Sequence, residues 1–240
     1  MTNVAVVSFA GTVGKTTLTK EMVVPLLGNA QRIQIESINS AAEGADVAMH
    51  ARQFRYLAEK LVVSRDNLVI DIGGSNIESV LAQMAKMEGI EEDIHWWVVP
   101  VDERTKVITD TLNTISHLIN ELNVDPARIV VVANNIEYPK DMHNRLGPVL
   151  AAAKKAGFHF HPMGVLKSDL FDEVKDSKKC IIELADDTTD YGPLIAAEND
   201  EKKRDELGRK VTVRRMARSL ARNIRDVWAA TPMGSVVEAA

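Results

Sequence analysis

The chain has 240 residues, of which 45% are hydrophobic and 26% are charged, which suits one sizeable α/β domain with its own core. Its formal net charge of −5 excludes a global attraction to nucleic acid or to anionic membranes, so any basic surface must be local. The single cysteine, Cys180, excludes a disulfide framework and a multi-cysteine metal site, and its apolar neighbours predict a buried, unreactive thiol.

Short apolar runs alternate with longer amphipathic stretches along the chain. The apolar runs predict six strands, at 4–7, 32–35, 68–70, 95–101, 129–133 and 158–161. Helices are predicted over 15–27, 44–62, 76–88, 104–122 and 141–156, and over a basic stretch at about 208–228. Apolar runs without alternation, separated by helices, are typical of a parallel sheet covered on both faces. We therefore expect a three-layer α-β-α fold with a mostly parallel central sheet, formed as a single domain over residues 1–240.

The chain shows no signal for secretion or for membrane insertion. Its first apolar run ends in glycine and lysine after a few residues, and no segment approaches the ~20 apolar residues of a membrane span. A soluble cytoplasmic protein that does not contact membranes is expected.

The stretch after the first predicted strand has the composition of a phosphate-binding loop. Gly11, Gly14, Lys15 and Thr16 follow the strand directly and open a helix, which is the context that such a loop requires. Main-chain N–H groups can point at phosphate oxygens there, and the helix N-terminus adds partial positive charge. The predicted nucleotide contacts in this loop are Gly11, Thr12, Val13, Gly14, Lys15, Thr16 and Thr17.

Three side chains of the loop have distinct expected roles. Lys15 would neutralise the β- and γ-phosphates, Thr16 would ligate Mg²⁺, and Thr17 would bond the α-phosphate. The alternative is a glycine turn that merely joins a strand to a helix, with Lys15 in solvent. A cation near a helix N-terminus is unfavourable without an accompanying anion, which favours the nucleotide site.

Residues 10–17, AGTVGKTT, resemble the deviant phosphate loop of the ParA/MinD superfamily, usually written KGGVGKTT, at six of eight positions. The resemblance covers about residues 3–185 and is strongest at this loop. Within the superfamily the chain is similar to small plasmid-encoded ATPases of the StbB or TraL kind. The resemblance implies a P-loop NTPase fold of the SIMIBI class, ATP or ADP with Mg²⁺ as cofactors, and a nucleotide-dependent homodimer.

Two positions of the loop depart from the family. The signature lysine, which in the family reaches across the dimer to the partner's phosphates, is replaced by Ala10, and the second glycine is replaced by Thr12. Either another cation substitutes for this lysine, or the dimer and its hydrolysis are weakened.

Residues 68–71, LVID, resemble a Walker B strand, and Gly73 and Gly74 begin the switch loop that follows it. A carboxylate at the carboxyl end of a buried strand, beside a phosphate loop, can hold a Mg²⁺-bound water. Asp71 is therefore a predicted catalytic residue together with Lys15, and a predicted metal ligand together with Thr16. Gly73 is a predicted nucleotide contact in a loop that moves with the γ-phosphate. The alternative is that Asp71 is only a helix cap or a turn residue.

The segment after the second strand falls where the family has its other switch. Glu36 takes the first acidic position, but Ile38 stands where the family has the acid credited with orienting the attacking water. The neighbouring Asn39 could orient a water but not act as a base. Hydrolysis is therefore expected to be slow or to await a partner, unless this segment is an ordinary strand-to-helix loop.

Two asparagines end the fifth predicted strand. An amide carries a donor and an acceptor and can pair with an adenine edge, and the family often has asparagine at this strand end. Asn134 is favoured over Asn135 as the base contact; both could also be simple turn formers. The chain has no N-K-x-D guanine motif, so ATP is preferred over GTP. Residues 160–183 are similar to a late family segment that flanks the base.

The C-terminal part carries a local excess of positive charge. At 100° per residue a basic stripe and an apolar stripe separate on the predicted helix. The apolar stripe (Val213, Met216, Leu220, Ile224 and Val227) is expected to dock on the domain. The basic stripe would then offer non-specific DNA contacts through Lys210, Arg214, Arg218, Arg222 and Arg225. A solvated face, or pairing with acidic groups of the same chain, remains an equal alternative.

These patterns favour a Mg²⁺-dependent ATP-binding switch, or weak ATPase, in plasmid DNA partition, stability or conjugative transfer, with a protein partner that is an adaptor or a DNA-binding protein. The alternative is a nucleotide-binding module with little or no hydrolysis that serves as a scaffold for a partner. A small-molecule kinase ranks lower, because the region of its lid, 135–175, holds only Arg145.

Overall fold

The computed structural model describes residues 1–35, 47–49, 54–74, 76–175 and 177–237. Its centre is a sheet of seven strands in the order β3-β2-β4-β1-β5-β6-β7, and all neighbouring strands are parallel. The strands are β1 (Asn3–Val6), β2 (Ala30–Ile35), β3 (Val47–Met49), β4 (Asn67–Ile72), β5 (Trp96–Val101), β6 (Ile129–Ile136) and β7 (His159–Leu166). The predicted parallel sheet is confirmed.

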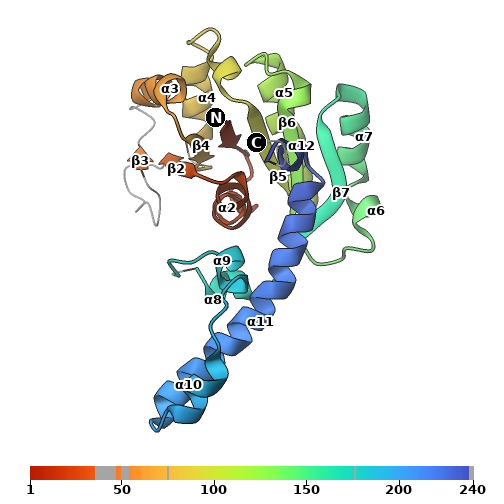
Figure 1. Cartoon of the computed structure of the whole chain (residues 1–240). Helices are drawn as coiled ribbons and strands as arrows, with labels where there is room; N and C mark the ends of the chain where they lie inside the picture. Colours follow the sequence, from red (N-terminus) through yellow and green to blue (C-terminus); the bar gives the residue numbers. More distant parts are fainter. Residues whose placement is uncertain (36–46, 50–53, 75, 176, 238–240) are drawn as a thin grey trace.

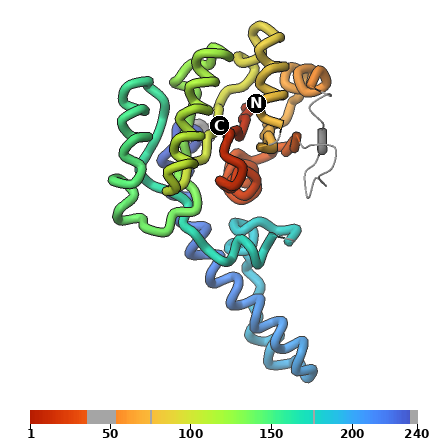
Figure 2. The backbone as a smooth tube through the Cα atoms, turned by 180° about the vertical axis from the view of Figure 1, so that it is seen from behind, coloured from red at the N-terminus to blue at the C-terminus, as the bar shows by residue number. Residues whose placement is uncertain are grey.

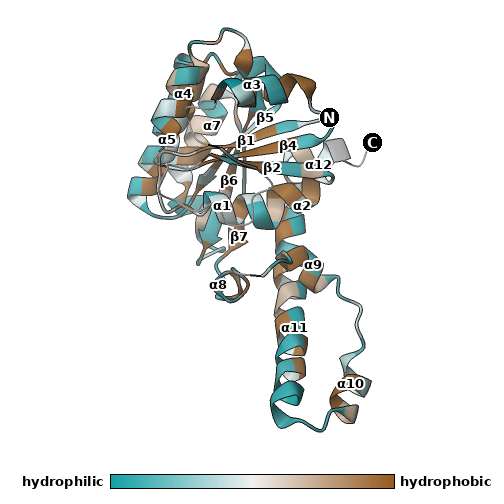
Figure 3. Cartoon of the chain, turned by 90° about the vertical axis from the view of Figure 1, so that its left-hand side faces the viewer, coloured by the Kyte–Doolittle hydropathy of each residue, from teal (hydrophilic) through white to brown (hydrophobic). Residues whose placement is uncertain are grey.

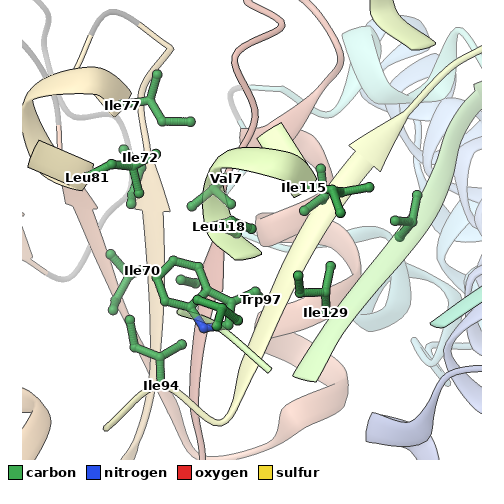
Figure 4. Packing of buried hydrophobic residues seen from close by; sticks show 14 of the residues in the cluster. Val7, Ile70, Ile72, Ile77, Leu81, Ile94, Trp97, Ile115, Leu118 and Ile129 are labelled. Carbon is green, nitrogen blue, oxygen red and sulfur yellow. The ribbon is translucent and has the colours of Figure 1, made fainter. Parts of the chain in front are cut away.

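Helices cover both faces of the sheet, as the three-layer prediction requires (Figure 1). One layer contains α3 (Phe54–Val63), α4 (Ile77–Met84), η3 (Ile90–Asp93), α5 (Thr105–Asn120), α6 (Met142–Arg145) and α7 (Gly147–Ala156). Its core includes Ile70, Trp97 and Leu118, which come from two strands and α5 (Figure 4). A short helix, η4 (Pro126–Arg128), precedes β6.

The other layer begins with the helix that follows β1. It comprises α1 (Lys15–Leu18), η1 (Thr19–Val23) and α2 (Val24–Leu27), which together span the predicted helix 15–27. The middle part is a π-helix. Pro25 follows it, and because proline has no N–H and crowds the carbonyl four residues earlier, it accounts for the widened turn.

The predicted helix 44–62 is wrong in its first part. Residues 47–49 form β3, which pairs with Ile33–Ile35 of β2, and the helix begins at Phe54. From Phe54 onward, buried side chains recur at helical spacing, at Phe54, Leu57 and Leu61.

The last strand is longer than predicted, because it continues through Pro162 to Leu166. A proline is tolerated there because β7 lies at the edge of the sheet. Gly164 lets β7 approach β6 closely, since a Cβ at this position would lie 2.6 Å from Ile136 Cγ1. The open edge is covered by α11, whose Asn223 accepts a hydrogen bond from Leu166 N and donates one to Gly164 O.

The C-terminal part forms an arm that leaves the α/β core (Figures 1 and 2). It contains α8 (Leu170–Glu173), α9 (Ile181–Ala185), α10 (Tyr191–Ala197) and the long α11 (Glu201–Ala229), and α12 (Pro232–Val237) returns to the core. The predicted basic helix lies within α11, which begins earlier because Asp200 caps it through Lys202 N and Lys203 N. All buried residues of α11 lie from Ala217 onward, and the far half of the helix is hydrophilic (Figure 3). None of the helices that the structure describes is long and apolar enough to cross a bilayer.

Candidate nucleotide site

The predicted phosphate loop lies at the carboxyl end of β1, in the middle of the sheet. Gly14 adopts a left-handed conformation with φ of 79°, and Lys15 opens α1 immediately afterwards. A side chain would be strained at this φ, which explains why glycine stands there. The loop therefore leads directly into a helix N-terminus. Main-chain N–H groups at such a junction can bind an anion.

Lys15 is buried, with 5% of its surface exposed. Its ammonium donates hydrogen bonds to Ala10 O at 2.6 Å and to Ser8 O at 3.1 Å. The ammonium therefore lies inside the curve of the loop, where a phosphate would be held, and is not a solvated first-turn lysine. This geometry favours the nucleotide site over the simple glycine turn.

Asn134 holds the loop from β6, which is separated from β1 by β5 in the sheet. It is buried, and its Nδ2 donates to Val13 O at 2.9 Å. A Cβ on Gly14 would lie 2.4 Å from this nitrogen, so a larger residue at position 14 would clash with Asn134. Asn135, by contrast, is exposed and has φ of 57°. The structure brings Asn134 to the loop, and its role in reading the base stays a prediction.

Asp71 is the second-last residue of β4, beside the loop, and is 1% exposed. Burial raises the pKa of its carboxyl above the ordinary value, while Arg32, the Thr16 hydroxyl and Lys15 lower it. Oδ2 accepts a hydrogen bond from Arg32 at 2.8 Å, whereas Oδ1 meets no donor at hydrogen-bond geometry in the described part of the chain. Mg²⁺ prefers hard oxygen ligands. The Thr16 hydroxyl and the nearby carboxylate of Asp71 are groups of this kind.

The two switch glycines lie differently. Gly73 donates its N–H to Ile35 O at 3.0 Å and so is tied to β2. Gly74 lies against the phosphate loop, because a Cβ there would lie 3.4 Å from both Gly11 Cα and Lys15 Nζ. The structure thus brings Gly74, the residue after the predicted contact Gly73, to the loop. Ser75 and the predicted second switch, with Glu36, Ile38 and Asn39, lie outside the described residues.

A cavity of about 210 Å³ opens beside the loop. It is bounded by the phosphate loop, by the end of β6 and by the segment that leads into α8, through Thr12, Val13, Gly14, Thr17, Asn134, Asn135, Lys167, Ser168, Asp169, Phe171 and Asp172. The segment 167–172 belongs to the late stretch that sequence similarity placed near the base. The cavity therefore joins the predicted phosphate and base contacts in one hollow.

Sequence reasoning missed two arginines. Arg32 of β2 is buried against Asp71, and Arg104, which precedes α5, donates to Thr12 O at 2.8 Å and to Thr12 Oγ1 at 3.2 Å. The strand around Arg32 also contains Gln31 and Gln34, so the sequence did not mark Arg32 as a buried exception. Nothing local in the sequence marked Arg104.

The predicted basic stripe of α11 does not simply face solvent. Arg214 donates to the carbonyls of Asp187 and Thr189, Arg218 to that of Ala185, and Arg225 pairs with Asp186. Only Lys210 and Arg222 of the five make no hydrogen bond or ion pair within the described ranges. In the apolar stripe, Met216 is 41% exposed, whereas Leu220, Ile224 and Val227 are buried as expected.

A larger cavity, of about 530 Å³, lies in the arm between residues 173–191 and α11. Its walls mix apolar side chains, such as Val174 and Val213, with charged ones such as Glu206 and Lys210. None of its walls comes from the phosphate loop or from the carboxyl ends of the strands. We therefore place the nucleotide site at the smaller cavity, where the chemistry lies.

Comparison with known proteins identifies relatives in structure only. No family model and no curated protein matches the sequence. The MinD cell division protein of Aquifex aeolicus is similar with a TM-score of 0.53 and 12% identity, over 76% of this chain and 89% of that chain. A chain of the MinC:MinD cell division protein complex from Aquifex aeolicus gives a TM-score of 0.55 and 12% identity, over 76% of this chain and 88% of that chain. A complex of a Cyanothece McdA variant with ATP gives 0.50 and 16%, over 77% and 90%.

At these identities the likeness establishes the fold. The resemblance that the phosphate loop first indicated is confirmed at that level: the chain has the α/β fold of the ParA/MinD superfamily of P-loop proteins.

Proposed function

We propose that the chain is a Mg²⁺-dependent, ATP-binding switch protein with slow or partner-stimulated ATPase activity. The observation that carries the proposal is the cluster of Lys15, Thr16 and Asp71, gathered at one end of the sheet around a loop whose Gly14 is left-handed. Similarity in fold to McdA, which was solved with ATP, supports this ligand. We further propose that the protein dimerises with nucleotide and acts in plasmid DNA partition, stability or conjugative transfer.

Each residue of the cluster has a task in this proposal. The loop N–H groups and Lys15 bind the phosphates, while Asn134 holds the loop in the shape that points those N–H groups inward. Thr16 and Asp71 would hold Mg²⁺, directly and through a water respectively, and the ion would supply charge neutralisation for phosphoryl transfer. Gly74, packed against Gly11 and Lys15, is placed to sense whether the terminal phosphate is present.

The test compares Lys15→Ala with the wild type by calorimetry, using ATP, ADP and GTP with Mg²⁺. The wild type is expected to prefer adenine nucleotides. The variant should lose about tenfold or more in affinity, because a charge-assisted contact to phosphate is worth roughly 1.5–3 kcal/mol. Lys106→Ala, which removes an exposed lysine of α5, is the matched control and should bind normally. Equal ATP affinity in wild type and Lys15→Ala would contradict the proposal.

One observation favours a second candidate, a nucleotide-binding module that serves as a scaffold with little or no hydrolysis. Ala10, at the place of the family's signature lysine, is buried in the core cluster with 2% exposure and offers no cation. Phosphate release measured with Mg²⁺-ATP, alone and with duplex DNA or a candidate partner protein, separates the two functions. Absence of turnover under every condition, with binding intact, would select the scaffold.

Dimerisation is tested separately by sedimentation with ADP and with a non-hydrolysable ATP analogue. A sedimentation coefficient that rises only with the ATP analogue is expected of a nucleotide-dependent homodimer. The same value with both nucleotides would remove the dimer from the proposal without affecting the nucleotide site.

A further inference from the structure

A second cation reaches the phosphate loop from another part of the chain. Ala10 is apolar and buried, so position 10 offers no charge to a phosphate. Arg104, from the segment between β5 and α5, reaches the loop instead, with its Nη2 2.8 Å from Thr12 O and its Nη1 3.2 Å from Thr12 Oγ1.

Asp102 fixes this guanidinium in place. Asp102 is 2% exposed, and its Oδ2 accepts hydrogen bonds from both Nε and Nη2 of Arg104. Oδ1 accepts from the main-chain N–H of Arg104 at 2.9 Å. The guanidinium therefore lies between a buried carboxylate and the loop, and its position is set before any ligand arrives, which lowers the entropy lost on binding.

The guanidinium keeps the capacity to bind an anion. Of its five N–H groups, four make these bonds to Asp102 and Thr12. One N–H of Nη1 has no acceptor among the residues that the structure describes, and the other bonds the hydroxyl of the exposed Thr12. Half of the side chain, 53%, is exposed. An incoming phosphate oxygen can thus reach Nη1 without breaking the contacts to Asp102.

The position of Thr12 in the loop indicates which phosphate is reached. Thr17 stands at the helix end of the loop, where the α-phosphate is expected, and Lys15 next to it serves the β- and γ-phosphates. Thr12 lies three residues before Lys15, on the side of the loop toward β1. A cation held at Thr12 is therefore nearest to the terminal phosphate.

We propose that Arg104 supplies the second cation of the phosphate site and contacts the terminal phosphate of ATP bound by its own chain, in place of the lysine that Ala10 removes. Asp102 is its positioning residue. This inference rests on the proposed function as an ATP-binding protein. It implies that the protein distinguishes ATP from ADP through a side chain outside the phosphate loop.

The experiment measures the affinities of Arg104→Lys and Arg104→Gln for a non-hydrolysable ATP analogue and for ADP, by calorimetry with Mg²⁺. Arg104→Gln keeps a hydrogen-bonding side chain without the charge, and is expected to lose about 10- to 100-fold for the ATP analogue, with ADP affinity within about twofold of wild type. Arg104→Lys should regain part of the loss, because it restores the charge without the planar fork. Arg128→Ala, at the last residue of η4, is the control and should change neither affinity.

The outcomes are distinguishable. If Arg104→Gln lowers both affinities equally, or neither, Arg104 is only a latch on the loop and the inference is wrong, while the nucleotide site stands. If the wild type binds neither nucleotide, the proposed function itself fails and the inference fails with it. Thermal unfolding of each variant confirms that the comparison is made on folded protein.

Discussion

At Asp71 a buried carboxylate meets a buried guanidinium. Arg32 and Asp71 are 4% and 2% exposed in their side chains and lie 2.8 Å apart, and Arg32 also donates to Gln34 Oε1 at 2.9 Å. Removing one partner of such a pair leaves an uncompensated charge in a medium of low dielectric constant, which is costly. Asp71, the predicted metal ligand, therefore also affects the stability of the fold.

We expect Arg32→Met to lower the free energy of unfolding by about 3–5 kcal/mol at pH 7. Arg32→Met combined with Asp71→Asn should recover most of the loss, because neither charge of this pair is then left buried without its partner. The measurement is urea unfolding of the wild type, both single variants and the double variant. Additive losses in this cycle would show that the two side chains do not depend on each other.

The same variant has a defined pH dependence. Burial already raises the pKa of Asp71 above 3.8, and losing Arg32 removes a group that opposes this rise. A carboxyl with a raised pKa stabilises the fold fully below its unfolded pKa, and this stabilisation is lost as the pH rises through the folded pKa. The deficit of Arg32→Met should therefore shrink as the pH falls toward 4 and be largest at neutral pH.

Cys180 is expected to be unreactive in the folded protein. Burial raises the pKa of its thiol from 9.0 to about 11, which leaves about a hundredfold less thiolate at pH 8. Alkylation by iodoacetamide should be at least that much slower in native protein than in urea-unfolded protein, and should accelerate as the pH rises toward 11. Equal native and unfolded rates at pH 8 would mean that the thiol is accessible.

The site residues that could be predicted from the sequence are those whose place in the site follows from their position along the chain. Gly14, Lys15 and Thr16 lie in the loop between β1 and the helix that follows it, and Asp71 lies near the end of the adjacent parallel strand β4. Arg32 and Arg104 were not predictable, because their partners Asp71 and Thr12 lie 39 and 92 positions away. Such pairs depend on which strands become neighbours, and one sequence does not specify this.

At the scale of elements, a buried carboxylate joins the helix after the phosphate loop to the arm. Glu21 of η1 accepts a hydrogen bond of 2.7 Å from Ile181 N, at the start of α9. Burial raises the pKa of Glu21, although this hydrogen bond and Lys20 lower it. Keeping Glu21 charged therefore costs free energy. Its hydrogen bond from Ile181 N links η1 to α9.

We expect Glu21→Gln to be more stable than the wild type at pH 7–8, because its amide oxygen still accepts from Ile181 N without a buried charge. The stabilisation from a carboxyl with a raised pKa is complete below its unfolded value, near 4.5, and is lost as the pH rises through the folded value. The two proteins should therefore converge near pH 4 and diverge above it. Chemical unfolding across this range is the measurement, and parallel curves would contradict the assignment.

Sheet elements were predictable from apolar runs, and the exceptions have physical causes. Val4–Val6, Leu68–Ile70 and Ile129–Ala133 are apolar throughout, since both faces of their strands are covered. The strand β3 has only three residues and takes its stability from pairing with β2. The extension of β7 through Pro162 depends on its edge position, which is a property of the assembled sheet.

At the scale of the whole molecule, the arm carries exposed positive charge, although the net charge of the chain is −5. Arg204, Arg215 and Arg222 are exposed, make no hydrogen bond or ion pair through their side chains within the described ranges, and fall within about 20° of one another on α11. Ile224, which is buried against the core, lies about 180° from Arg215 on the same helix. These three arginines, and not Arg214, Arg218 and Arg225, form the outward basic face, and we propose that this face carries the non-specific DNA contacts.

We expect wild-type protein to bind duplex DNA at low salt and to release it as salt rises, because phosphate contacts release counterions. Changing Arg204, Arg215 and Arg222 together to glutamate should lower the affinity about tenfold or more and reduce the slope of log affinity against log salt by up to about 3. The matched control changes Lys106, Lys154 and Lys155, three exposed lysines of the core, to glutamate and alters the net charge of −5 by the same amount. Fluorescence anisotropy across a salt series measures both. An equal loss in the two triple variants would assign the effect to overall charge, and no loss in the arm variant would remove DNA from the arm altogether.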